Sequence, residues 1–408
     1  MTNAALTSML ITLCLVSPLL AEDLPVNIHK IADQKDPDLS VLPGGLGIAV
    51  WNSYDQDGDS GGIFARRIEP NGPAGPEFQV NALAAGNQAE PCAAVDANGF
   101  VLVAWRGPWL DPNDEDIVAR LLDPNGQPLT EDFRVNTHAA SDQSYPRAAA
   151  GPGGTFVVVW VSATGPDTDR SCIFGQRVDR AGNLLGTEMA ISDTPLYYTR
   201  YPDVAIDGLG HVAASWLEDR TTDSVRVRLF DANCAPKGDS VKVNSVGLRG
   251  LARPSVAVRP DGALVVAWDG DPNKASDDDI RARVLDVNAA PLGDEFIVNT
   301  TRAGAQVNPR VAINGKGEFM VVWEGPTADP NEGAELYGQW FDANSQPVGG
   351  EVRLNEFVPG DQGQAHVAIG DAGWSIVVWE SEEQDGSGDG IFAAVTPSTD
   401  PNALPPEI

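Results

Sequence analysis

Residues 91–136 read PCAAVDANGFVLVAWRGPWLDPNDEDIVARLLDPNGQPLTEDFRVN, and the same order of features recurs along almost the whole chain. The unit holds a Pro, a short apolar run, a tight turn, an apolar segment ending in Trp105 and an acidic loop. Two more apolar segments follow, joined by a turn that begins with Asp, and the unit ends in Val-Asn. We label its four predicted strands A to D in chain order. Short strands repeated at a fixed period indicate a repeat architecture.

Tryptophans at the end of predicted strand B give the period. They recur 52 to 56 residues apart, at Trp51, Trp105, Trp160, Trp216, Trp268, Trp323 and Trp379. Seven units fall within the usual range of about 4–8 blades for β-propellers, in which four-stranded sheets repeat around a central channel. The sequence therefore predicts an all-β fold, a seven-bladed β-propeller of four-stranded antiparallel blades, over residues 24–396.

The two ends of this region complement each other. The last unit has segments for strands A, B and C but stops near Val395 without a strand D. Leu24-Pro25-Val26-Asn27, near the start of the chain, has the ending of a strand D. We therefore predict that the N-terminal strand completes blade seven and closes the ring, which an open solenoid with polar caps would not need.

Two residues that recur once per blade are predicted to be structural. Asp opens the turn between strands C and D in five blades, where its carboxylate accepts backbone N–H groups. These residues are Asp123, Asp179, Asp231, Asp286 and Asp342. Arginine recurs in strand C at positions 66, 120, 228 and 283, with Gln176 and Gln339 at the matching places. We expect this position to hold blades together.

Composition sets the class of protein. The 408-residue chain has a formal net charge of −31, which argues against nucleic acid as a partner. Residues 1–21 resemble a signal peptide, with an apolar run too short to span a membrane, so we expect a secreted, extracellular or periplasmic protein without membrane insertion. Residues 397–408 are expected to form a disordered tail. We expect a monomer. Cys92, Cys172 and Cys234 do not form a disulfide framework, since their repeat positions differ and their number is odd.

The motifs resemble a repeat class of large secreted bacterial proteins. Val-Val-Trp is followed by an acidic Gly-rich loop such as 384–391, then by Phe-Asp, and then by Glu-Phe-x-Val-Asn. The resemblance covers residues 24–395 and implies a propeller in an extracellular setting, with no general activity. The loops also loosely resemble the calcium loops of integrin-type propellers.

The residue after the repeat proline is predicted to line the mouth of the channel. It differs in every blade while its neighbours stay apolar, as at Asp38, Cys92, Arg147, Asp203, Ser255, Arg310 and His366. Such variation on a uniform scaffold is typical of a ligand site. We expect Arg147 and Arg310 to offer donors to a carboxylate or sulfate, and weakly charged or neutral sugars to bind better than polyanions. The alternative is a water-filled pore in which Asp and Arg pair with each other.

The loops between strands B and C carry a formal charge of −22, on the same predicted face as this ring. Alternating carboxylates are ligands that Ca²⁺ prefers, so calcium is a possible cofactor, with a solvated acidic face as the alternative. The candidate metal ligands are Asp55, Asp57, Asp59, Asp277, Asp279, Asp385 and Asp389. The EF-hand pattern is not met, because Ser60 holds the place of its glycine.

Extra aromatic residues occur on this face. Trp109 lies in the second loop between strands B and C, and Tyr197, Tyr198 and Tyr201 precede the repeat Pro202. Aromatic rings beside Arg and Asp suit stacking on sugars, whereas simple packing over the rim is the alternative.

These features support three functional hypotheses. The first is a secreted, non-catalytic binding or interaction module whose ligand, a glycan or a protein, binds at the channel mouth. The second is a hydrolase or lyase that acts on a glycan there, for which a general acid–base pair such as Asp203 and His366 must approach one point. The third is a structural component of a surface layer. We predict the first, because the sequence contains no signature of hydrolytic or nucleotide chemistry.

Overall fold

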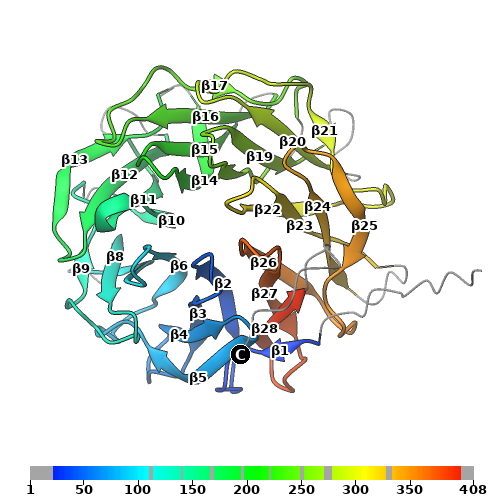
Figure 1. Cartoon of the computed structure of the whole chain (residues 1–408). Helices are drawn as coiled ribbons and strands as arrows, with labels where there is room; N and C mark the ends of the chain where they lie inside the picture. Colours follow the sequence, from blue (N-terminus) through cyan, green and yellow to red (C-terminus); the bar gives the residue numbers. More distant parts are fainter. Residues whose placement is uncertain are drawn as a thin grey trace, which may run out of the picture.

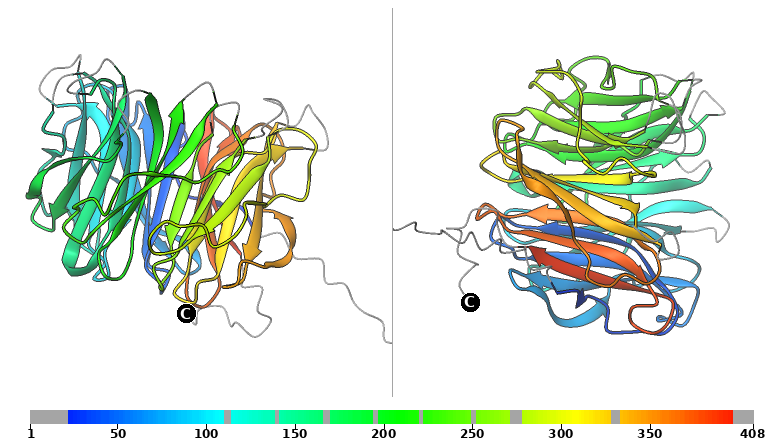
Figure 2. Two further views of the ribbon diagram at one scale, coloured as in Figure 1. Left: turned by 90° about the horizontal axis from the view of Figure 1, so that it is seen from above. Right: turned by 90° about the vertical axis from the view of Figure 1, so that its right-hand side faces the viewer.

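The computed structural model shows seven four-stranded antiparallel sheets around a central axis, and thus confirms the seven-bladed β-propeller (Figure 1). It describes residues 22–109, 114–138, 141–165, 170–193, 197–219, 222–248, 252–270, 278–327 and 333–396. The predicted signal peptide and C-terminal tail lie outside these ranges and stay predictions. Seen edge-on, the blades pack side by side (Figure 2). Among the described residues, no helix is long and apolar enough to cross a membrane.

The strands follow the chain blade by blade, from the channel outward. Blade one has β2 (Gln34–Val41), β3 (Gly47–Tyr54), β4 (Gly61–Glu69) and β5 (Gly72–Gln79), and blade two has β6 (Ala89–Val95), β7 (Val101–Pro108), β8 (Glu115–Leu122) and β9 (Phe133–Arg134). Blade three has β10 (Gln143–Ala150), β11 (Thr155–Ser162), β12 (Cys172–Asp179) and β13 (Leu184–Ala190), with a short 3₁₀ turn at Pro152–Gly154. Blade four has β14 (Tyr198–Ile206), β15 (Val212–Asp219), β16 (Ser224–Phe230) and β17 (Val241–Lys242). Blade five has β18 (Ser255–Val258), β19 (Leu264–Asp269), β20 (Ile280–Leu285) and β21 (Phe296–Ile297). Blade six has β22 (Val307–Ile313), β23 (Phe319–Pro326), β24 (Ala334–Phe341) and β25 (Pro347–Arg353).

The two ends of the chain meet in blade seven, as predicted. Strands β26 (Gln362–Ile369), β27 (Ser375–Glu382) and β28 (Asp389–Thr396) pair in order, and β1 (Leu24–Pro25) adds the fourth strand beside β28. Leu24 lies opposite Ala393 and Pro25 opposite Phe392. The backbone N–H of Val26 then donates to the carbonyl of Ile391 at 2.8 Å.

The apolar core lies between blades. The indole of each strand-B tryptophan is at most 1% exposed, and each packs with apolar residues of an adjoining blade. Strand B therefore has buried side chains on both of its faces, which explains why its sequence is nearly all apolar instead of alternating.

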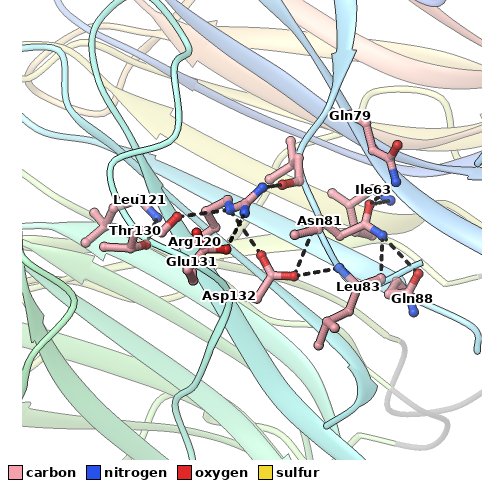
Figure 3. A network of polar contacts seen from close by, with 12 residues as sticks. Ile63, Gln79, Asn81, Leu83, Gln88, Arg120, Leu121, Thr130, Glu131 and Asp132 are labelled. Carbon is pink, nitrogen blue, oxygen red and sulfur yellow. Dashed lines mark hydrogen bonds and ion pairs between the residues drawn. The ribbon is translucent and has the colours of Figure 1, made fainter. Parts of the chain in front are cut away.

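Two kinds of side chain fasten the end of each strand D. In blade one, the side chain of Asn81 accepts the N–H of Ile63 at 2.8 Å and donates to the carbonyl of Leu83 at 2.9 Å. Asp132 of blade two accepts the N–H of Ala82 at 2.8 Å and that of Leu83 at 3.0 Å (Figure 3). The asparagine at the end of strand D and the carboxylate of the next blade thus join each blade to the one before it, and we call this pair of contacts the latch.

The same latch recurs around the ring. The carboxylates are Asp23, Glu77, Asp132, Glu188, Glu295 and Glu351, each of which accepts a backbone N–H just after the strand D of the preceding blade. Between blades three and four the direction reverses, since Asp193 of blade three accepts the N–H of Ser240 at 2.6 Å. Asp23, which precedes β1, fastens blade seven to blade six.

The recurring arginines and aspartates have the structural roles that the sequence predicts. Arg120 donates to the carbonyl of Val80 in the preceding blade at 2.7 Å (Figure 3). Arg66, Arg228 and Arg283 make the corresponding contacts. Each turn aspartate accepts backbone N–H groups two and four residues on, as Asp123 does from Asn125 and Gln127.

Deletion of Leu24–Lys30 tests the closure of the ring. The deletion leaves the N–H of Ile391 without the side chain of Asn27, which accepts it at 2.8 Å, and removes the partners of Arg66 and Glu77. Each buried polar group without a partner costs about 1–3 kcal/mol. We expect a large drop in Tm or aggregation through the exposed edge of β28, measured by thermal unfolding. Asn125→Ala, in an exposed turn, is the control, and an unchanged Tm for the deletion would contradict closure.

Candidate active site at the channel mouth

Strand A of each blade begins with a distortion beside the repeat proline. In six blades the pairing of strands A and B shifts register there, for example between Lys35 and Asp38 in blade one. The residue just before the proline has a φ of about 50° in the same six blades, at Asp36, Glu90, Tyr145, Tyr201, Asn308 and Gln364 (the last precedes Ala365). Left-handed backbone is unfavourable for residues other than glycine, and such strain concentrates at functional sites.

Carboxylates of the preceding blade hold this strained backbone. Glu380 of blade seven accepts the N–H of Asp36, and Glu90 of blade two accepts that of Tyr145 at 2.7 Å. Glu324 of blade six accepts the N–H of Gln364 at 2.7 Å. Each inter-blade contact therefore sets the direction of one side chain at the mouth.

We call the seven residues before the repeat proline the pre-proline ring: Asp36, Glu90, Tyr145, Tyr201, Arg253, Asn308 and Gln364. Six of them, all but Asn308, line a cavity of about 230 Å³ at the channel mouth. Arg147, Asp203, Arg310 and His366, which follow the proline and were predicted as ligand-binding residues, line the same cavity. The structure thus brings four of these predicted residues together with a second set that the sequence analysis missed, apart from Tyr201.

His366 forms a fixed chain with Asp38 and Arg310. Its Nδ1 lies 2.6 Å from Asp38 Oδ1, and Arg310 Nε donates to its Nε2 at 3.2 Å. Because arginine has no acceptor, Nε2 carries the lone pair and Nδ1 the hydrogen. Burial lowers the pKa of His366, and the nearby Arg310 adds to this effect, so the ring is neutral. Both ring nitrogens are engaged, so His366 is not a free base.

Asp38 and Asp203 join neighbouring blades instead of pairing with arginine. Asp38 Oδ2 accepts the N–H of Ala93 at 2.9 Å, and Asp203 Oδ2 accepts the N–H of Val256 at 2.8 Å and the hydroxyl of Ser255 at 2.9 Å. The expected alternative of mutual Asp–Arg pairs is therefore not what these residues form. Asp203 and His366 are both committed to structural contacts, so they do not serve as the acid–base pair considered above. Cys92 is fully buried, and burial raises the pKa of its thiol.

Two carboxyls of the cavity have shifted acidity. Burial raises the pKa of Asp36, whereas the nearby Arg147 guanidinium opposes that shift. Burial also raises the pKa of Glu90, and the Asp36 carboxylate adds to the rise while Arg106 opposes it. A neighbouring carboxylate and burial both favour the protonated form, so this pair of carboxyls is suited to holding a proton in the cavity.

Tyrosines cover one side of the cavity. The rings of Tyr145 and Tyr201 meet edge to face with centroids 5.7 Å apart, and the Arg253 guanidinium lies 5.0 Å from the centroid of Tyr201. Of the other predicted aromatic residues, Trp109 packs partly buried against the core between blades one and two. Tyr198 is exposed beside Arg170 and Arg200, and Tyr197 is partly buried nearby, but neither lines the cavity.

The predicted metal ligands are spread over separate contacts. Asp59 accepts the N–H of Gly86 at 2.9 Å, Asp389 pairs with Lys35 at 2.8 Å, and Asp279 pairs with Arg302 at 2.7 Å. Asp57 accepts a loop N–H, Asp385 accepts the amide of Asn27, and the backbone of Asp55 closes its loop on Ser60. Asp277 lies outside the described residues. Across the ranges that the structure describes, no group of three or more His, Cys, Asp or Glu is placed to hold a metal, and calcium binding stays a prediction.

Comparison with known proteins finds similarity in structure but not in sequence. No family model and no curated protein matches the sequence. Among solved structures, an ulvan lyase from a new family of polysaccharide lyases superposes with a TM-score of 0.56 at 12% identity, over 93% of this chain and 96% of the other. A Penicillium chrysogenum α-L-arabinanase complexed with arabinobiose gives 0.53 at 14% identity, over 80% and 99%. At such identities the likeness shows the shared propeller fold, and the resemblance to a secreted bacterial repeat class extends no further than that fold.

These comparisons correct the main functional prediction. Propellers that the structure resembles are glycan-acting enzymes, so the prediction of a non-catalytic binding module is wrong, and its alternative of a hydrolase or lyase is favoured. A structural surface-layer component gains no support from them.

The buried carboxylate of Glu380 provides a test of the inter-blade contact behind Asp36. Burial raises its pKa from 4.5 to about 8, with Asp36 and Asp389 adding to the shift. A raised carboxyl pKa favours folding below the unfolded value, and that contribution is lost as the pH rises toward 8. The Tm of Glu380→Gln relative to wild type should therefore increase between about pH 5 and pH 9. Glu383→Gln, at an exposed position, is the control, and a pH-independent difference would contradict the burial of this charge.

Proposed function

We propose that the protein is an enzyme that cleaves glycosidic bonds of a glycan bound in the channel-mouth cavity. The observation that carries this proposal is the presence of Asp36 and Glu90 in one cavity, on strained backbone held by neighbouring blades. Two carboxyls flanking a scissile bond are the usual equipment of glycoside hydrolysis. We also infer that the protein is secreted, extracellular or periplasmic, because residues 1–21 resemble a signal peptide.

The environments of the two carboxyls suggest their roles. Burial raises the pKa of Glu90, and Asp36 adds to the rise while Arg106 opposes it, so we assign to Glu90 the proton that is given to the glycosidic oxygen. Asp36 lies near the Arg147 guanidinium and the backbone N–H of Glu90, and both favour its ionised form against the effect of burial. It would then act as the base that activates a water molecule or as the nucleophile at the anomeric carbon. His366 has both ring nitrogens engaged, so it is not available as the base of an elimination.

The remainder of the cavity suits a sugar. Tyr145 and Tyr201 offer apolar ring surfaces beside polar side chains, a combination that sugar rings match with their C–H faces and hydroxyls. The volume of about 230 Å³ is below the roughly 300–1,000 Å³ of pockets for drug-sized ligands, so the cavity would enclose one sugar residue while the loops bind its neighbours. The named propellers with a similar fold, an ulvan lyase and an arabinanase, are compatible with this substrate class.

Substitution of the two carboxyls tests the proposal. Glu90→Gln and Asp36→Asn should each lower cleavage of the best substrate in a polysaccharide panel by about 100-fold or more, because acid–base catalysis contributes roughly 10²–10⁴-fold. New reducing ends report cleavage, and ultraviolet absorbance of a new C=C bond would reveal elimination instead of hydrolysis.

Glu131→Gln is the matched control, since it removes the same charge from a side chain that is 94% exposed on another part of blade two. It should keep full activity and the wild-type Tm. Because Glu90 also accepts the N–H of Tyr145 at 2.7 Å, the Tm of each active-site variant is measured to show that it is folded at the assay temperature. Full activity of Glu90→Gln on an accepted substrate, or no cleavage of any panel member by the wild type, would reject the assignment.

A further inference from the structure

We propose that the sugar residue enclosed in the cavity carries a carboxylate, so that the substrate is a glycan with uronic acid units. This inference rests on the proposed function, because it assigns the substrate class of the same site. It arises from three arginines that lie around one cavity of an otherwise acidic protein and use few of their donors on the fold. The chain has a net charge of −31, yet Arg147, Arg253 and Arg310 all line one cavity of about 230 Å³.

The three guanidiniums use few of their donors within the fold, although Asp36, Glu90 and Asp203 line the same cavity. Arg147 donates to the carbonyl of its neighbour Pro146 at 2.9 Å, and Arg310 donates to His366 and to the carbonyl of Pro309. Arg253 lies beside the ring of Tyr201, and its guanidinium donates to no residue in the described ranges. Within those ranges none of the three forms an ion pair with a carboxylate.

The arginines also disfavour each other's charge. Burial lowers the pKa of Arg310 to about 10, and the neighbouring Arg147 guanidinium adds to that shift, whereas Asp203 and Asp38 oppose it. Asp203 uses both carboxylate oxygens on Val204, Ser255 and Val256. An anionic group on the ligand would therefore meet guanidinium donors that the fold leaves unused.

A carboxylate fits the remaining donors best. The planar fork of arginine binds carboxylates through two parallel hydrogen bonds. Arg253 keeps its whole guanidinium for such a contact, and Arg147 keeps all but the donor used on Pro146. The tyrosines beside them would cover the sugar ring that bears the group. The acidic loops around the mouth repel dense polyanions, which favours uronic acid residues separated by neutral sugars.

Calorimetric titration of the full chain carrying Glu90→Gln, which prevents turnover, tests the inference. Oligosaccharides in which uronic acid alternates with neutral sugar should bind, whereas the same oligosaccharides with the carboxyl reduced to an alcohol should bind at least about tenfold more weakly. Adding Arg147→Gln or Arg253→Gln should weaken binding of the carboxylated form by about tenfold and leave the reduced form unaffected. Arg67→Gln, an exposed arginine outside this cavity, is the control for net charge.

The outcomes separate this inference from the proposed function. Equal binding of carboxylated and reduced forms, or selective binding of a sulfated neutral oligosaccharide, would overturn the inference even if the protein cleaves glycans. Carboxylate binding that depends on Arg147 and Arg253, but no cleavage by the wild type, would sustain the inference and reject the proposed function. Unchanged carboxylate binding in both arginine variants, with the Tm of each preserved, would also overturn it.

Discussion

The structure depends on one repeated hydrogen-bonding arrangement at the end of strand D. An asparagine or serine there caps strand C of its own blade, and a carboxylate from the next blade takes the backbone N–H groups that follow. These groups lie at blade edges, where unpaired backbone would be costly. Because Asp23 and Glu77 make the same contacts on either side of blade seven, the ring closes without a special interface.

Because these hydrogen bonds join the blades at their outer strands, the residues at the start of the inner strands can differ from blade to blade. The channel mouth lies at the same end of the blades as these latches, but it is formed by the innermost strands. A second set of carboxylates, which includes Glu90, Glu324 and Glu380, crosses between blades there and supports left-handed backbone before the proline. Strain at the mouth is thus offset locally by hydrogen bonds to these side chains, while global stability comes from elsewhere.

The sequence predicted the fold nearly completely, and it singled out some of the residues that line the candidate cavity. The number of blades follows from the seven regularly spaced tryptophans. The closure follows from the last unit, which lacks strand D, and from the extra strand at the start of the chain. Both features can be read from one sequence without relatives. Arg147, Arg310 and His366 were found because the position after the proline varies. Asp36 and Glu90 were missed, since a residue before proline is expected in extended backbone and its left-handed conformation arises from the neighbouring blade. The position before the proline is occupied by a different polar or aromatic residue in most blades, and this variation could have identified it from the sequence.

The side chains of the pre-proline ring differ in chemical type from one side of the channel mouth to the other. Going round the channel, blades one and two contribute acids, blades three and four tyrosines, blade five an arginine, and blades six and seven amides. A symmetric scaffold would present the same group seven times and could not orient a ligand. Here the acids and Arg253 are separated by the tyrosines, so a sugar lying on the aromatic rings would direct one edge toward Asp36 and Glu90 and another toward the guanidinium. Departure from the repeat at this position, and at the position after the proline, would therefore convert a structural ring into a site that distinguishes the ends of its ligand.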